Sequence, residues 1–112
     1  MKTPMENRIL EINENWHGQT VTLNKGDYLN IKLIENPSTG FSWEISEMDD
    51  TQFKVTEDTV SNQMKGEFGA SIEKVIQLKA LKSGISSLEI IYKRPWEKGS
   101  QENKIFIELV VQ

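Results

Sequence analysis

Residues 105–111 read Ile-Phe-Ile-Glu-Leu-Val-Val, and a large apolar side chain recurs there at every second position. The same alternation runs through three other stretches: 29–33, 41–45 and 88–92. A period of two is typical of a β-strand that buries one face. Weaker alternation predicts four further strands: 8–12, 19–23, 53–57 and 71–80. The chain therefore reads as a series of short strands.

The segment at 72–82 is the one place where a helix competes with a strand, because it is rich in good helix formers. A helical face through Ile72, Val75 and Ile76 would next present Lys79, which breaks the apolar stripe. The strand face through the same segment is interrupted only by Lys74. We therefore expect a strand here.

Turn residues divide the chain every 8–12 residues, which is typical of a β-sandwich. We expect an all-β, immunoglobulin-like antiparallel β-sandwich of about seven to eight strands that forms one domain over residues 1–112. The chain has no cysteine, so this sandwich has no disulfide. Trp43 lies on an alternating strand, where we expect it to be part of the core.

Composition excludes several classes of function. Seventeen acidic against 13 basic residues give a net charge of −4, so we expect no nucleic-acid and no membrane partner. With no cysteine and only His17, we expect no metal site, no cofactor and no enzyme activity. Ser38 and Thr39 lack a nearby base that would make either a nucleophile. The acidic residues Asp49, Asp50 and Asp58 lack the spacing of a calcium loop.

The first 15 residues contain no apolar stretch of the kind found in secretory signals, and no run in the chain is long enough to span a bilayer. We therefore expect a cytoplasmic protein, or a lysosomal or secreted one if a leader was removed. A fold without disulfides is compatible with a reducing compartment.

Three connections have an unusual composition, and strand parity brings them together. In an up-and-down chain of strands every second connection falls at the same end, so the connections at 35–40, 64–70 and 93–103 should share one end of the sandwich. In the first, Pro37 fixes φ and Gly40 permits a positive φ, which predicts a rigid tip. In the third, Pro95 stiffens a segment that carries Arg94 and Trp96, two residue types enriched at binding hot spots. By composition alone this segment is equally well a structural corner or a binding site.

These connections resemble the motifs of a known family. Residues 36–43, Asn-Pro-Ser-Thr-Gly-Phe-Ser-Trp, resemble the Asn-Pro-Ser/Thr-Thr-Gly-Phe/Tyr-x-Trp motif of chagasin-type inhibitors of papain-like cysteine peptidases. Residues 92–96, Tyr-Lys-Arg-Pro-Trp, resemble that family's Tyr-x-Arg-Pro-Trp motif, and Gly66-x-x-Gly69 is similar to its glycine-rich middle loop. Motif order, spacing and length match over the whole chain.

The resemblance implies a reversible, tight-binding inhibitor that blocks the active-site cleft of a papain-like, cathepsin-type cysteine peptidase with three loops. It also implies a chain with no catalytic residue of its own, and we expect it to be a monomer when free. The peptidase-binding residues that it implies are Asn36, Pro37, Ser38, Thr39, Gly40 and Phe41 in the first loop, Gly66, Glu67, Phe68 and Gly69 in the second, and Arg94, Pro95 and Trp96 in the third.

Two alternatives stay open at this stage. Phe68 stands where the family commonly has glycine, so either the middle loop docks differently or Phe68 fills an apolar subsite. The competing function is a non-inhibitory carbohydrate-binding or adhesion sandwich, in which Trp96 and Phe68 would stack on sugar rings.

Overall fold

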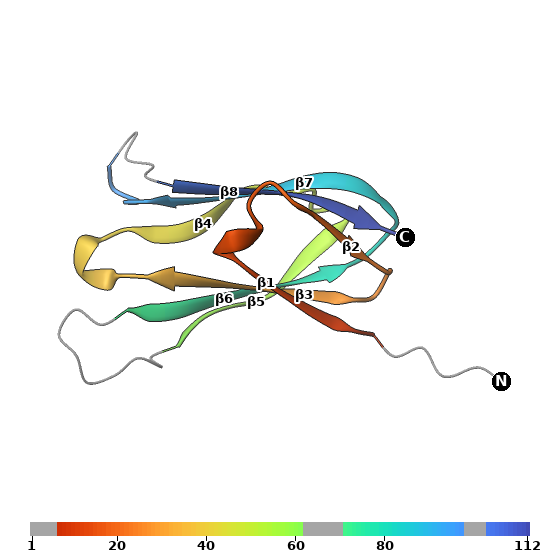
Figure 1. Ribbon diagram of the computed structural model, residues 1–112, viewed down its shortest axis with the longest axis horizontal. Coiled ribbons are helices and arrows are strands. Elements are labelled where there is room, and N and C mark those ends of the chain that lie inside the picture. The colour runs from red at the N-terminus through yellow and green to blue at the C-terminus, as the bar shows by residue number, and fades with distance from the viewer. Residues whose placement is uncertain (1–6, 62–70, 98–102) are drawn as a thin grey trace.

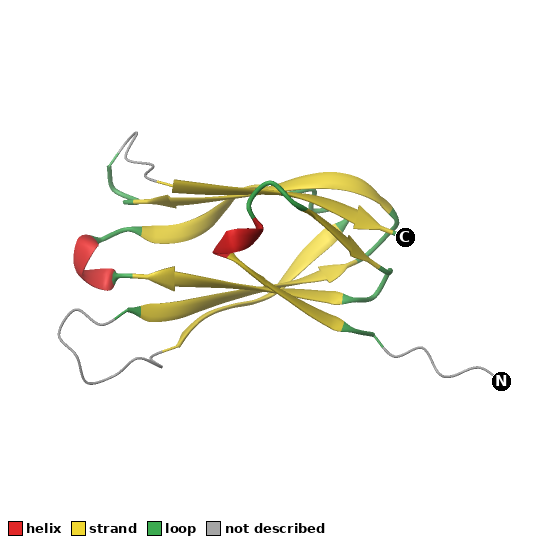
Figure 2. Ribbon diagram, viewed as in Figure 1, coloured by secondary structure: helices red, strands yellow, loops and turns green. Residues whose placement is uncertain are grey.

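The computed structural model describes residues 7–61, 71–97 and 103–112, and it places two four-stranded β-sheets face to face (Figure 1). One sheet has the order β1-β3-β6-β5 and the other the order β2-β8-β7-β4. The strands are β1 (Ile9–Asn13), β2 (Thr20–Leu23), β3 (Tyr28–Glu35), β4 (Ser42–Glu47), β5 (Phe53–Ser61), β6 (Ile72–Ala80), β7 (Gly84–Lys93) and β8 (Asn103–Val111). Two short 3-10 helices, η1 (Glu14–Trp16) and η2 (Pro37–Thr39), lie in connections (Figure 2).

The strands agree closely with the alternation in the sequence. Residues 72–80 of the ambiguous segment form β6, whose Ile76, Leu78 and Ala80 are buried, and the last two residues of the segment lie in the turn that follows. Lys74 shares this face and makes an ion pair with Asp58 at 3.2 Å, which explains how a charged residue is tolerated there. The sandwich predicted from the sequence is confirmed.

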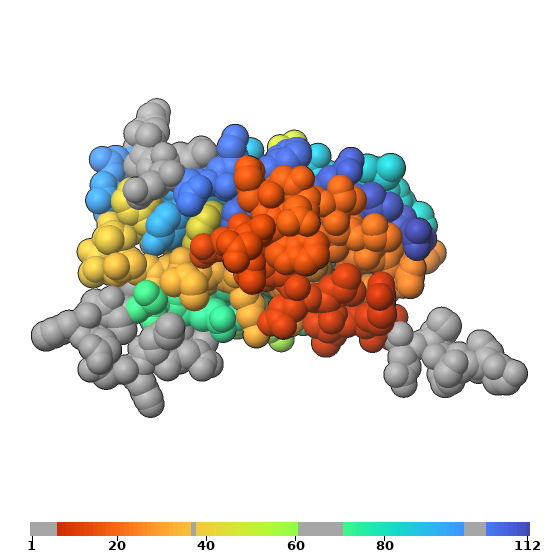
Figure 3. All heavy atoms as spheres, in the orientation of Figure 1, coloured from red at the N-terminus to blue at the C-terminus, as the bar shows by residue number. Residues whose placement is uncertain are grey.

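The pairing differs from the expected antiparallel pattern at two edges. The strand β1 pairs in parallel with β3, and β2 pairs in parallel with β8, whereas the other four pairings are antiparallel. Between β1 and β2 the chain passes through η1 from one sheet to the other, and Figure 3 shows this N-terminal stretch covering the front flank of the sandwich. Alternation within a strand reports which face is buried but not the direction of its neighbour, so the sequence could not predict these pairs.

The core lies between the two sheets and is filled by inward-facing side chains of both. Leu29, Ile31 and Leu33 of β3 are fully buried, and Trp43 of β4 is 3% exposed. The core position predicted for Trp43 is therefore confirmed. Burial of apolar surface at roughly 25 cal/mol per Å² is what holds the two sheets together in a chain without a disulfide.

A buried carboxylate closes the sandwich where β3 begins. Asp27 is 2% exposed and accepts hydrogen bonds from the backbone N–H groups of Asn24 at 2.8 Å and of Arg8 at 3.0 Å. The Arg8 guanidinium also binds it, at 3.1 Å. Burial by itself raises the pKa of the Asp27 carboxyl, but the hydrogen bonds from Arg8 and Asn24 outweigh burial and hold that pKa below its usual range. Asp27 therefore ties the segment before β1 to the β2–β3 turn.

Candidate peptidase-binding end

The strand ends confirm that the three unusual connections begin and finish at one end of the sandwich. Glu35, the last residue of β3, pairs with Ile72, the first of β6. Ser42 at the start of β4 pairs with Lys93, and Tyr92 pairs with Asn103 at the start of β8. In Figure 1 these ends all lie on the left, where η2 forms the connection between β3 and β4. Gly66, Glu67, Phe68 and Gly69 lie outside the described residues, so the middle loop stays a prediction.

The first connection, residues 36–41, which we call the tip, is closed by hydrogen bonds among its own residues. The Asn36 side-chain oxygen accepts from the backbone N–H of Ser38 at 3.1 Å and from the Ser38 hydroxyl at 2.7 Å. The Asn36 carbonyl accepts from the backbone N–H of Thr39 at 3.1 Å and from the Thr39 hydroxyl at 2.9 Å. The tip is thus a tight 3-10 turn, a form that the sequence did not predict. The side chains of Ser38 and Thr39 are exposed at its surface.

Gly40 joins the tip to the third connection. Its φ is +82°, a conformation that side chains other than glycine's adopt at a cost. A Cβ atom on Gly40 would lie 2.5 Å from Cη2 of Trp96, so the indole rests directly on this glycine. Trp96 nevertheless leaves 72% of its surface exposed. The structure therefore places a large exposed aromatic ring beside the tip, at the position that the sequence singled out.

Arg94 makes a second link between these two connections. Its Nε donates to the carbonyl of Thr39 at 3.0 Å, its guanidinium lies 4.4 Å over the ring of Phe41, and its Nη1 donates to Glu97 at 3.1 Å. The resemblance assigned Arg94 and Phe41 to peptidase binding. In the free protein both residues also brace the tip.

Two residues at the base of the tip were not among the predicted site residues. The Tyr92 hydroxyl accepts from the backbone N–H of Asn36 at 3.2 Å, and its ring packs between Phe41 and Trp43, with centroids 5.3 and 4.7 Å away. The Glu35 carboxylate is buried and accepts from the backbone N–H of Trp43 at 2.8 Å. A signal for Glu35 exists in the sequence, because it continues the inward alternation of β3 with a charged residue in place of an apolar one.

Two other polar residues considered from the sequence, His17 and Asp49, have structural partners. Nδ1 of His17 accepts from the backbone N–H of Phe106 at 3.0 Å. Asp49 accepts from the backbone N–H of Thr51 at 2.9 Å and from its hydroxyl at 2.6 Å; these bonds, the hydroxyl first, lower the pKa of its carboxyl. Among the described residues no group of three or more histidine or acidic side chains is arranged to hold a metal ion. Neither 3-10 helix of the described chain is long or apolar enough to cross a membrane.

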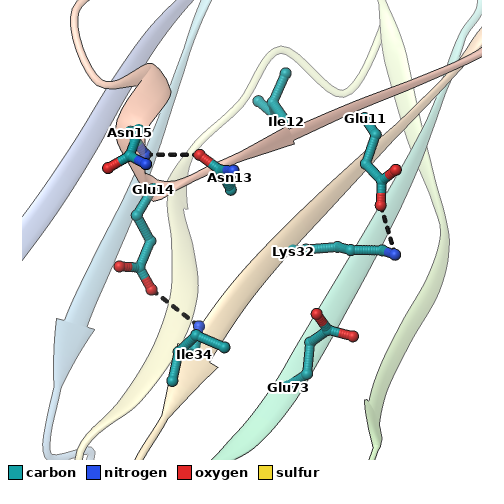
Figure 4. Close-up of a pocket in the computed structure, with 8 residues that line it drawn as sticks. All are labelled: Glu11, Ile12, Asn13, Glu14, Asn15, Lys32, Ile34 and Glu73. Carbon is teal, nitrogen blue, oxygen red and sulfur yellow. Dashed lines mark hydrogen bonds and ion pairs between the residues drawn. The ribbon is translucent and has the colours of Figure 1, made fainter.

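A groove of about 460 Å³ lies apart from the tip, between η1 and the outer face of β1, β3 and β6 (Figure 4). Several of its polar side chains are engaged with their neighbours. Lys32 forms an ion pair with Glu11, and this hydrogen bond raises the pKa of the lysine. Glu14 accepts from the backbone N–H of Ile34 at 2.9 Å. None of the predicted binding residues lines this groove.

Comparison with known proteins agrees with this site. Residues 22–111 match the model of the family described as "Chagasin family peptidase inhibitor I42". A tip and an exposed tryptophan at one end of a disulfide-free β-sandwich, together with this match, define a peptidase inhibitor rather than an enzyme. The chain belongs to the chagasin family of peptidase inhibitors.

One curated relative and two solved structures are similar to this chain. Amoebiasin-2 of Entamoeba histolytica is 38% identical over 84 residues, which are 73% of this chain and 68% of Amoebiasin-2. The crystal structure of the cysteine protease inhibitor EhICP2 from Entamoeba histolytica superimposes with a TM-score of 0.88 at 31% identity, covering 96% of this chain and 99% of that one. PbICP-C, solved in complex with falcipain-2, has a TM-score of 0.66 at 21% identity, covering 95% of this chain and all of PbICP-C, and this likeness extends to the fold alone.

Proposed function

We propose that this chain is a reversible, tight-binding inhibitor of papain-like, cathepsin-type cysteine peptidases, and that the tip and Trp96 enter and cover the active-site cleft. The observation that carries the proposal is the tip itself, a closed turn with an exposed tryptophan resting on its glycine. Membership of the chagasin family and the similarity to EhICP2 support the same function.

The geometry of the tip explains how it would block a nucleophile without being cut. Peptidases bind the scissile segment of a substrate in an extended form, whereas Pro37–Thr39 form a 3-10 turn. The carbonyl of Thr39 already accepts from Arg94, and the carbonyl of Asn36 already accepts from Thr39. Turning either of these two carbonyl carbons toward the thiolate would break the bonds that hold it. Inhibition then needs no covalent step.

The same bonds favour tight binding. Because the tip is ordered before it meets the enzyme, little conformational entropy remains to be lost on docking. Trp96 adds a large exposed aromatic surface, the kind of side chain that most often dominates an interface. Three loops at one end of a small domain suit an interface of about 800 Å² per partner.

The direct test is titration of the pure protein against papain and several cathepsins. We expect stoichiometric loss of peptidase activity that returns on dilution. A wild-type chain that leaves every such enzyme active at micromolar concentration would refute the proposal. An enzyme whose active-site cysteine carries a small cap should still bind, because no bond to sulfur forms.

A variant locates the contact. Thr39→Asp places a charge on the exposed tip, and burying that charge in the cleft should weaken inhibition. Inhibition equal to that of the wild type would mean that another surface meets the nucleophile. The carbohydrate-binding alternative gains no support from the family match, and a glycan array with the same protein sample tests it directly.

A further inference from the structure

The tip joins strands of different sheets, and this sets it apart from an ordinary hairpin loop. The strand β3 belongs to one sheet and β4 to the other. In a β-hairpin, ladder hydrogen bonds between the two strands close the base of the loop. Because β3 and β4 are not paired with each other, side chains must close the base of the tip.

Glu35 provides the central link at this base. It is the last residue of β3, only 6% of its surface is exposed, and its Oε2 accepts from the backbone N–H of Trp43, the second residue of β4, at 2.8 Å. The bond therefore spans the two sheets. A carboxylate is a costly group to bury, and the inward alternation of β3 would be continued more cheaply by an apolar residue.

Two further bonds surround this link. The indole Nε1 of Trp43 donates to the carbonyl of Ile34 at 2.9 Å, which ties the same two strands a second time, again with Trp43 as the donor. On the other side, the backbone N–H of Asn36 donates to the hydroxyl of Tyr92. The backbone is thus fixed directly before and shortly after the tip, by groups outside the tip.

From this arrangement we propose that Glu35 is a positioning residue for inhibition: its buried carboxylate sets the separation and angle at which the tip leaves the two sheets. The inference rests on the proposed function, because it concerns how the same tip is presented. Glu35 itself acts through the backbone of Trp43 and not by contact with the peptidase.

A positioning role has a kinetic signature. Without the carboxylate the base of the tip samples several arrangements, and only the fraction that matches the cleft can dock. The apparent dissociation constant rises by the inverse of that fraction. If arrangements interconvert quickly, the association rate constant falls by the same factor while the dissociation rate constant of the docked complex stays unchanged. Loss of a contact residue usually acts instead on the dissociation rate constant.

The experiment measures both rate constants for Glu35→Leu, Glu35→Gln and a matched control against one papain-like peptidase. Leucine removes the acceptor and keeps an apolar side chain of similar size, whereas glutamine retains a carbonyl oxygen for the Trp43 N–H. The control is Gln52→Leu, which also replaces a buried polar side chain with an apolar one. Gln52 lies just before β5, at the end of the sandwich away from the tip, and its side-chain oxygen accepts a hydrogen bond from Ser86. Amide hydrogen exchange of Trp43 reports directly on the base of the tip.

We expect the association rate constant of Glu35→Leu to be about tenfold lower than that of the wild type, as for a tip that can dock about a tenth of the time. Its dissociation rate constant should be unchanged, and hydrogen exchange at the Trp43 amide should be faster. Glu35→Gln should restore most of the association rate. Gln52→Leu should inhibit like the wild type even where its thermal midpoint falls as far as that of Glu35→Leu.

Three results would overturn the inference: association of Glu35→Leu at the wild-type rate, a change confined to dissociation, or an equal loss in Gln52→Leu, which would show a mere effect of stability. A wild-type chain that does not inhibit refutes the proposed function itself, and the inference with it. Inhibition by the wild type and equally by Glu35→Leu refutes the inference alone.

Discussion

The two ends of the sandwich are closed by different means. At the end where β3 begins, Asp27 is buried and binds Arg8 and Asn24, and backbone bonds such as Gly26 N–H to the Ala80 carbonyl join the turns. At the tip end, side chains carry the cross-links, and Trp96 stands exposed beside a glycine. One end buries an ion-paired carboxylate and joins its turns by backbone bonds, whereas the other presents a braced turn outward.

This difference teaches that stability and inhibition should be separable in this chain. Changes at the Asp27 end should alter the free energy of unfolding and leave inhibition intact. Changes at the tip end should alter inhibition with little effect on the fold. Four variants test this separation, in order of decreasing effect.

Gly40→Ala should have the largest effect on inhibition. The new Cβ would meet Cη2 of Trp96 at 2.5 Å, and alanine is strained at a φ of +82°. Both the tip and the indole must move, so we expect inhibition to weaken by about 3 kcal/mol. Inhibition constants measure the effect, and the circular dichroism spectrum checks that the sandwich is kept. Unchanged inhibition would mean that Trp96 has no fixed place in the complex.

Trp96→Ala should weaken inhibition by about 2 kcal/mol through faster dissociation, because an exposed aromatic anchor is lost. With 72% of its surface exposed, Trp96 contributes little to the core, so the thermal midpoint should barely change. Stopped-flow kinetics and a melting curve separate the two effects. A large fall in the midpoint would place Trp96 in the structural part of the molecule instead.

Asp27→Asn should cost about 1.5 kcal/mol of unfolding free energy at neutral pH, since the charge-assisted bonds to Arg8 and Asn24 weaken. The pKa of Asp27 is lowered by folding from 3.8, so its contribution is fully present above about pH 4 and is lost as the pH falls through the folded pKa. The unfolding free energies of the wild type and the variant should therefore converge in acid. Urea unfolding between pH 7 and pH 2 measures this, with the inhibition constant at pH 7 as the control. A gap that does not narrow as the pH falls would exclude the charge as its source.

Arg94→Lys should have the smallest effect, about 1 kcal/mol weaker inhibition. Lysine keeps the charge but lacks the planar group that both donates to the Thr39 carbonyl and covers Phe41. Titration of peptidase activity measures the loss. The control is Lys93→Arg, an exchange between the same two residue types at the last residue of β7, which precedes Arg94 in the chain. Equal inhibition by both variants would show that the brace adds nothing to binding.

Much of this molecule could be predicted from local patterns. Alternation located every strand, including β6 against its helix-forming composition, and Trp43 was correctly placed in the core. Parity placed the connections at one end because it depends only on the number of strands between them. The parallel pairing of β1 with β3 and of β2 with β8 could not be predicted, since the direction of a neighbouring strand leaves no trace in the alternation.

The site shows the same division. Residue types marked the tip. Pro37 restricts φ at its own position and Gly40 permits a positive φ at its own, so both effects are local. The roles of Glu35 and Tyr92 depend on partners brought near by the packing of two sheets, such as the Trp43 N–H across the base. A charged residue at an inward position was a visible anomaly, but its acceptor role required the second sheet.

The sequence by itself determined an all-β chain without thiols whose rigid tip carries an inhibitor family's motif, because turn and strand preferences act over a few neighbouring residues. Only the tertiary structure decided that Trp96 rests on Gly40, that Arg94 binds the Thr39 carbonyl and that Glu35 closes the base of the tip. These contacts join residues up to 56 positions apart (Gly40 to Trp96). The pairing of β4 with β7 and the packing of the two sheets set their distances.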